Sequence, residues 1–311
     1  GIRMQKKQTT AEAEIEKEKL NVDMYALNSR VNDLYFGILL LDEQLKQNAL
    51  LQDELERNYR QITAYVENGI ANQADLDAVK VEQLNTKQKR VELVSSRMAY
   101  LKMLSLLVGE KLSQETVLEK PVPQDDISAV GEIRRPELSL FNAQEVGLQV
   151  QEKALNVRHL PQFGLFVQGA YGNPGLNMLK NEFSPYYIAG VRLSWNFGSL
   201  YTLKNDRKVI ENKRRQLDNN RDVFLFNTRL EMTQQDQAIQ SLEKQMQDDD
   251  EIIRLRTNIR KSAEAKVANG TLTVTEMLRE LTNESLARQS KALHEIQRLM
   301  GIYQLKYTTN D

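Results

Sequence analysis

A single apolar seam with alternating steps of four and three residues crosses the first part of the chain and constrains the fold most. Its first positions are Leu20, Met24, Leu27, Val31, Leu34, Ile38, Leu41 and Leu45. The frame continues through the polar residues Asn48 and Gln52 and returns to Leu55, Tyr59, Ile62 and Val66. A 3.5-residue period held over roughly six heptads predicts a coiled-coil helix. Uninterrupted from about Thr10 to Glu67, such a helix would be roughly 85 Å long at 1.5 Å per residue. We therefore expect an extended helical element.

A short turn ends this helix. Asn68 and Gly69 are typical terminators with left-handed backbone, and Asn72 can cap a following helix. The apolar residues of that return helix are Leu76, Leu84, Val91, Val94, Met98, Leu101 and Val108. Two long helices joined by so few residues must fold back antiparallel. Beyond Gly109 we expect irregular chain up to about Arg135, followed by a shorter helix over residues 137–158.

The period changes from 3.5 to 2 after Pro161. In the second of two such runs, one face holds Tyr187, Ala189, Val191, Leu193, Trp195 and Phe197. The other face holds Ile188, Gly190, Arg192, Ser194 and Asn196. This alternation predicts membrane-spanning strands of a barrel, although a half-buried hairpin of a small cap domain would show the same pattern. The residues predicted to lie on the membrane side are Phe163, Leu165, Val167, Val191, Leu193, Trp195 and Phe197.

The helical part of the sequence occurs twice, with an offset of 201 residues. Val66-x-Asn68-Gly69 returns as Val267-x-Asn269-Gly270, and Asp75-Leu76 returns as Glu276-Met277. We therefore predict a second long helix after Gly198 and a second return helix. The apolar stripe expected on that return helix is Leu286, Leu293, Ile296, Met300, Tyr303 and Tyr307. The polar positions in the second seam are Gln235, Asp249, Arg256 and Arg260, and they indicate a helix that either borders water or packs loosely; in a tube wall, one face would border a wet interior.

Composition excludes several classes of function. The formal net charge of -1 gives no basic excess, which argues against a nucleic-acid partner. With no cysteine and two distant histidines, His159 and His294, we expect no metal site and no nucleophilic triad; both histidines are read as surface or packing residues. We find no phosphate-binding loop or nucleophile motif, so we expect no enzyme and no cofactor.

These features together resemble the TolC-like outer-membrane efflux protein family, also called outer membrane factors. The resemblance is carried by Tyr35-Phe36-Gly37-Ile38-Leu39, by the two Asn-Gly turns with their following acidic residues, by Arg135-Pro136-Glu137-Leu138, by Leu160-Pro161 and by Val191-x-Leu193-x-Trp195-x-Phe197-Gly198. It implies a mainly α fold of duplicated antiparallel coiled-coil hairpins forming an α-barrel tunnel, with strands of a membrane β-barrel. The implied parts are 1–109, first helical hairpin; 110–158, equatorial linker and short helix; 159–198, β-hairpin; and 199–311, second helical hairpin.

The resemblance also implies a function and partners. Family members are trimers that span the periplasm and outer membrane of Gram-negative bacteria as passive export conduits of tripartite efflux or type I secretion systems. They contact outer-membrane lipid, a periplasmic adaptor and, through the pump, an inner-membrane transporter. The residues that match the tip turns and entrance are Asn68, Gly69, Asp75, Asn269, Gly270, Glu276 and Arg279. Arg279 stands where some members have a second acidic residue, which argues against an acidic double ring here; Asp75 and Glu276 could equally be ordinary first-turn carboxylates.

One departure from the family pattern concerns the strands. The duplication implies two β-hairpins, whereas this sequence has one, so we expect a fragment that lacks the first hairpin. We expect such a fragment to be soluble and not to form pores, because unpaired strands expose their edges. The alternative function is a periplasmic coiled-coil adaptor or scaffold protein, although adaptors normally have one helical hairpin between β-rich domains.

Overall fold

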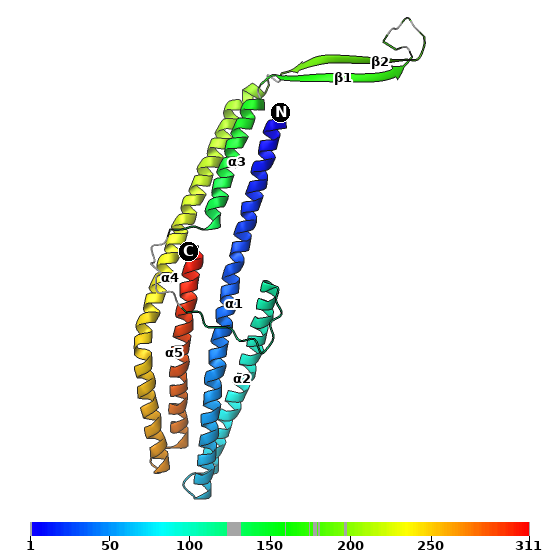
Figure 1. Ribbon diagram of the computed structural model, residues 1–311. Helices are drawn as coiled ribbons and strands as arrows, with labels where there is room; N and C mark the ends of the chain where they lie inside the picture. Colours follow the sequence, from blue (N-terminus) through cyan, green and yellow to red (C-terminus); the bar gives the residue numbers. More distant parts are fainter. Residues whose placement is uncertain are drawn as a thin grey trace. The chain divides into compact units, whose positions relative to one another are not determined.

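The computed structural model describes residues 2–122, 132–158, 160–173, 175–176, 179, 181–195 and 198–310. Across these residues the elements are the helices α1 (Ile2–Glu67), α2 (Gln73–Val108), α3 (Pro136–Arg158), α4 (Ser199–Ala268) and α5 (Val274–Thr309) and the strands β1 (Gln162–Gly172) and β2 (Ser184–Ser194) (Figure 1). The predicted mainly α fold with one β-hairpin is confirmed.

The chain divides into two compact units. One unit comprises Gly1–Val22 and Pro136–Phe224, and the other comprises Asp23–Arg135 and Leu225–Asp311. The first unit therefore holds α3, the β-hairpin and the first part of α1 and of α4. The second unit holds two helical hairpins, one formed by α1 with α2 and the other by α4 with α5 (Figure 1).

The predicted seam of α1 forms much of the core of the second unit. Leu34, Ile38, Leu55 and Ile62 are buried. The amide of Asn48, also in the seam, is buried and donates to the carbonyl of Thr86 on α2 at 3.1 Å. A buried polar group keeps such a position only if it is hydrogen-bonded, so the polar interruption of the seam is accommodated by α2.

The start of the seam differs from the prediction. Leu20 and Met24 are 60% and 58% exposed. The reason is helix length, because α2 has 36 residues and can accompany only the C-terminal part of the 66-residue α1. An apolar period alone does not tell where the partner helix ends.

The predicted stripes on the return helices are also corrected. On α2, Leu84 and Val91 are exposed. The residues of α2 that are buried are Val79, Thr86, Leu93, Arg97, Leu101 and Leu104. On α5, Leu286 is exposed, whereas Ile296 of the predicted stripe is buried together with Ala292, Leu299, Ile302 and Leu305. Both helices carry more than one apolar row, and contact with α1 or α4 decides which row is buried.

The β-hairpin is a two-stranded antiparallel sheet in the first unit. Its register runs from Gln162 opposite Ser194 to Gly172 opposite Ser184. Trp195, predicted to lie in the strand, directly follows it, and the predicted strand residue Phe197 lies outside the described residues. In the same unit, Phe141 of α3 contacts Phe224 of α4 with ring centroids 5.9 Å apart.

Candidate functional site

The turn between α1 and α2 has a fixed hydrogen-bond pattern. Gly69 has a left-handed backbone with φ of +72°. The amide of Ile70 donates to the carbonyl of Tyr65 at 2.8 Å, and that of Gly69 donates to the carbonyl of Val66 at 3.1 Å. These two bonds form a Schellman motif, which satisfies the last carbonyls of the helix. The side-chain amide of Asn68 adds a bond to the carbonyl of Ala64 at 2.7 Å.

The turn between α4 and α5 repeats this pattern at the predicted offset. Gly270 has φ of +70°. Its amide donates to the carbonyl of Val267 at 2.9 Å, and the amide of Thr271 donates to the carbonyl of Lys266 at 2.9 Å. Asn269 donates its side-chain amide to Ala265 at 2.8 Å. The two Asn-Gly turns are therefore the same structure built twice, in accordance with the predicted duplication.

The helix that leaves each turn begins with a capping box. The carboxylate of Asp75 accepts from the backbone of Asn72, whose side chain accepts from the amide of Asp75, both at 3.0 Å. In the second turn, Glu276 accepts from the backbone of Thr273 at 3.1 Å and from its hydroxyl at 2.8 Å. Hydrogen bonds from the hydroxyl and then the backbone of Thr273 lower the pKa of Glu276, and the nearby charge of Arg279 lowers it further.

The capping hydrogen bonds bear on whether Asp75 and Glu276 are ordinary first-turn carboxylates or residues of a channel entrance. Asp75 and Glu276 both act as first-turn capping carboxylates, the ordinary role. The exposed guanidinium of Arg279 lies 3.4 Å from a carboxylate oxygen of Glu280. A role for these residues at a channel entrance stays a prediction.

The outer surface of both turns carries no charged side chain. Residues 68–74 and 269–275 consist of Asn, Gly, Ile, Ala, Gln, Thr, Leu and Val. Ile70 is half exposed. A Cβ atom built on Gly69 or Gly270 meets no atom within 4 Å, so another molecule can approach the backbone closely at both positions. Contacts made by this surface would rest on backbone groups and small side chains.

Directly behind the turns, one apolar cluster joins the two hairpins. Its buried members are Leu55, Ile62, Val79, Ala263, Val267, Val274, Met277, Leu278 and Leu281, which come from α1, α2, α4 and α5. Because the cluster takes side chains from all four helices, the position of one turn depends on the other.

A buried ionic network lies beside this cluster, and sequence reasoning missed its centre. Glu284 of α5 is 2% exposed. Its carboxylate accepts from Arg260 of α4 at 2.5 Å, from Arg288 at 2.6 Å and from the hydroxyl of Thr257 at 2.8 Å. Arg260 also lies 3.7 Å from Glu54 of α1. Burial raises the pKa of Glu284, but the hydrogen bonds from Arg288, Arg260 and Thr257 outweigh it, so the net pKa is lowered.

The prediction that the polar positions of the second seam border water is wrong for Asp249 and Arg260, which are largely buried and paired with other residues. Gln235 donates its side-chain amide to Glu231 on the same helix at 3.2 Å. Arg260 belongs to the network around Glu284, and Arg256 lies 3.6 Å from Glu280. Asp249 is buried and lies 2.9 Å from Nδ1 of His294. The packing role predicted for His294 fits this contact, while His159 lies outside the described residues.

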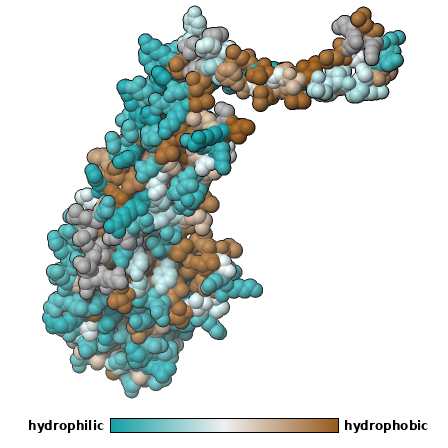
Figure 2. All heavy atoms as spheres, turned by 45° about the horizontal axis from the view of Figure 1, so that its top comes forward, coloured by the Kyte–Doolittle hydropathy of each residue, from teal (hydrophilic) through white to brown (hydrophobic). Residues whose placement is uncertain are grey.

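The β-hairpin has two unlike faces. Direct cross-strand partners share a face, and one face carries the pairs Phe163 with Leu193, Leu165 with Val191, Val167 with Ala189, Gly169 with Tyr187 and Tyr171 with Pro185. We call this set the apolar ladder. Leu165 is 86% exposed, and Figure 2 shows apolar side chains along the visible side of the hairpin. A contiguous apolar surface of this kind marks a contact with lipid or protein.

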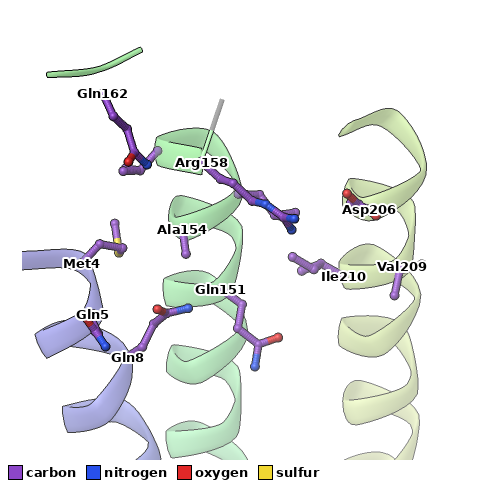
Figure 3. Close-up of a pocket in the computed structure, with 12 residues that line it drawn as sticks. Met4, Gln5, Gln8, Gln151, Ala154, Arg158, Gln162, Asp206, Val209 and Ile210 are labelled. Atoms are coloured by element: carbon purple, nitrogen blue, oxygen red, sulfur yellow. The ribbon is translucent and has the colours of Figure 1, made fainter. Parts of the chain in front are cut away.

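A groove of about 670 Å³ lies in the same unit, where the first turns of α1 approach α3 and α4 (Figure 3). Its lining residues are Met4, Gln5, Gln8, Gln151, Ala154, Leu155, Val157, Arg158, Gln162, Asp206, Val209 and Ile210. Four amides, one cation and one carboxylate are among the described residues that line it, and none of these described residues has a hydroxyl, thiol or imidazole that could act as a nucleophile with a base.

No group of three or more His, Cys, Asp or Glu side chains among the described residues could hold a metal ion. No helix within the described ranges combines the length and apolarity that crossing a membrane requires.

Comparisons with solved structures show the fold. The outer membrane protein VceC of Vibrio cholerae superposes with a TM-score of 0.76 at 13% identity, over 99% of this chain and 74% of its own. The outer-membrane channel MtrE of Neisseria gonorrhoeae superposes with a TM-score of 0.74 at 11% identity, over 99% of this chain and 71% of its own. The outer membrane channel CmeC of Campylobacter jejuni superposes with a TM-score of 0.72 at 13% identity, over 97% of this chain and 67% of its own. No family model matches the sequence, and no curated protein matches it. The chain has the TolC-like fold of outer-membrane efflux channels.

Proposed function

We propose that this chain belongs to the outer-membrane channel of a tripartite efflux or type I secretion system and acts as a passive conduit. In this proposal the protein is a homotrimer in the outer membrane of a Gram-negative bacterium. The helical hairpins of 1–109 and 199–311 form the periplasmic tunnel wall, 159–198 contributes strands to the membrane barrel, and 110–158 links them.

The observation that carries the proposal is the apolar ladder of the β-hairpin. On a chain with the fold of outer-membrane channels, a ladder of this kind fits a strand pair whose outer side contacts lipid. The opposite face, which we call the polar face, has the pairs Gln162 with Ser194, Gly164 with Arg192, Phe166 with Gly190, Gln168 with Ile188, Ala170 with Tyr186 and Gly172 with Ser184. Its polar side chains suit a water-filled interior.

The two Asn-Gly turns fit contact with a periplasmic adaptor, which would connect the channel to an inner-membrane transporter. Their uncharged surface and the open space beside Gly69 and Gly270 suit close packing against another helical turn. By the family resemblance, Asp75, Glu276 and Arg279 would lie at the entrance next to these turns. Among them a mixed pair, Glu276 with Arg279, replaces an acidic double ring.

No observation favours the alternative of an adaptor or scaffold. An adaptor would need one helical hairpin, whereas this chain has two with matching turns. The apolar ladder would also have no partner in a protein that is not inserted in a membrane.

The ladder provides the test. In the full-length protein, Leu165→Asp places a charge on the proposed lipid face, which costs about 2–4 kcal/mol near the bilayer midplane for the more costly cationic residues and less for acidic ones. Gln168→Asp places the same charge on the other face and is the matched control. We expect the Leu165 variant to be depleted from the outer-membrane fraction, and the parent and Gln168 variant to insert and conduct in planar bilayers. Equal insertion of both variants, or a parent without conductance, would contradict the proposal.

A further inference from the structure

The polar face of the β-hairpin carries one charged side chain. Across the sequences of β1 and β2, Arg192 is the one ionisable group with a charge at neutral pH. Its guanidinium carbon lies 5.4 Å from the centroid of the Phe166 ring. This is a cation–π contact, which orients the guanidinium over the ring face.

The register of the strands creates room for this contact. Arg192 is opposite Gly164, and Phe166 is opposite Gly190. Arg192 and Phe166 are therefore diagonal neighbours, a separation that long and aromatic side chains can span. A Cβ on Gly190 would lie 2.9 Å from ring atoms of Phe166, so the ring occupies the space that a larger residue would need. Gly164 and Gly190 have no side chains, so the space beside them is available to Arg192 and Phe166.

The direction of Arg192 follows from the alternation of the strand. Val191 and Leu193, its neighbours in sequence, belong to the apolar ladder, so Arg192 lies on the opposite face. If the ladder contacts lipid, Arg192 faces the interior, because an arginine in the hydrocarbon region is costly. A small ring of such side chains would line the interior of a trimer at one level.

We propose that Arg192 makes the channel interior prefer anions, and that small anions and the acidic groups of exported solutes are its ligands. This inference rests on the proposed function. Rings of arginine or lysine select anions in pores, and residues on the lumen face of barrels tune selectivity. Phe166 acts as the positioning residue, since it holds the guanidinium in place without adding charge.

Reversal potentials test the proposal. The full-length protein is inserted in planar bilayers with a KCl gradient, and the ratio of chloride to potassium permeability is compared between the parent and Arg192→Gln. We expect a severalfold lower ratio in the variant, with Arg192→Lys closer to the parent. Arg207→Gln on α4, outside the hairpin, is the control and should keep the parental ratio. An Arg192→Gln channel with the parental ratio would overturn the inference.

A thiol variant separates the effect of charge from that of folding, because the charge is added after the channel has inserted. The given sequence has no cysteine, so within it the reagent modifies the introduced thiol alone. Arg192→Cys is inserted first and then treated with a cationic or an anionic methanethiosulfonate, while Val191→Cys reports on the opposite face. We expect the cationic reagent to raise the chloride preference at position 192 and neither reagent to act at position 191. The reverse pattern, or no effect at 192, sinks the inference. A parent that does not conduct defeats the proposed function itself, whereas conducting channels with one common permeability ratio defeat the arginine role alone.

Discussion

At Gly69 and Gly270 a single backbone angle determines how each helix ends. With φ of +72° and +70°, both positions lie in the left-handed region, where a Cβ atom costs roughly 1–2 kcal/mol. We therefore expect Gly69→Ala to lower the free energy of unfolding by about 1 kcal/mol, measured by urea denaturation. Gly69→Asn should cost less, because asparagine tolerates this conformation. The space around Gly69 is open, so steric clash cannot explain a loss. Equal stability of the alanine variant and the parent would show that the turn is not formed in solution.

Glu276 gives a pH-dependent prediction at the same scale. Its pKa is lowered in the fold, chiefly by the hydroxyl and backbone of Thr273. The ionised carboxylate therefore stabilises the fold above its unfolded pKa, near pH 4.3, and this contribution disappears as the pH falls through the lower folded pKa. Glu276→Gln should melt below the parent at pH 7, and the difference should shrink as the medium becomes more acidic than about pH 4. A constant difference across this range would exclude the charged form of the capping box as its cause.

At the scale of elements, the network around Glu284 connects three helices. Removing one partner of a buried ion pair leaves the other charge uncompensated, which typically costs 3–5 kcal/mol. Because Arg260 also contacts Glu264 and Glu54, we expect a value near the lower end, about 3 kcal/mol, for Glu284→Gln in urea denaturation. Glu251→Gln, in the exposed pair with Arg254, is the control and should leave stability unchanged.

The double variant Glu284→Leu with Arg260→Met separates two explanations. If the loss in Glu284→Gln comes from the uncompensated arginine, replacing both partners by apolar residues should recover much of it. A double variant that is as unstable as the sum of the two single variants would show that the network contributes through each residue separately.

The helices and turns could be predicted from the sequence because their signals are local. The seam through Ile38 and Leu55, the Asn-Gly turns and the strand alternation all act within a few residues along the chain. The buried row of α2 could not be predicted, since Val91 and Leu93 are both apolar and only the neighbouring helix decides between them. Arg288 lies four residues from Glu284 on the same helix, a spacing that exposed ion pairs also have, whereas the partners Thr257 and Arg260 lie 27 and 24 residues away on α4. No local pattern therefore marks this glutamate as buried.

At the scale of the whole molecule, the duplication indicates which surface of the first hairpin is unused. The offset of 201 residues places Lys80, Gln83, Val91 and Ser95 of α2 at the positions of Leu281, Glu284, Ala292 and Ile296 of α5. The α5 residues are buried, and Ile296 packs with Phe36 and Leu39 of α1. Their α2 counterparts instead border an open groove between α1 and α2. The first hairpin thus leaves open the face that the second hairpin uses within the chain.

A head-to-tail contact between copies would cover this face and, if the rotation closes, form a ring. We therefore expect Val91→Glu to prevent assembly of the full-length protein while leaving its helix content unchanged, because Val91 is 63% exposed in the single chain. Glu54 of α1 faces the second hairpin within the chain, where it lies 3.7 Å from Arg260. Leu255 occupies the equivalent position on α4 and is exposed, so it would face the first hairpin of the next copy, and Leu255→Glu should have the same effect. Val117→Glu, in the segment after α2, is the control for an added charge at an exposed apolar residue. Light scattering of the detergent-extracted protein measures the outcome. Trimers of the Val91 and Leu255 variants as stable as the parent would show that copies do not meet through the faces related by the repeat.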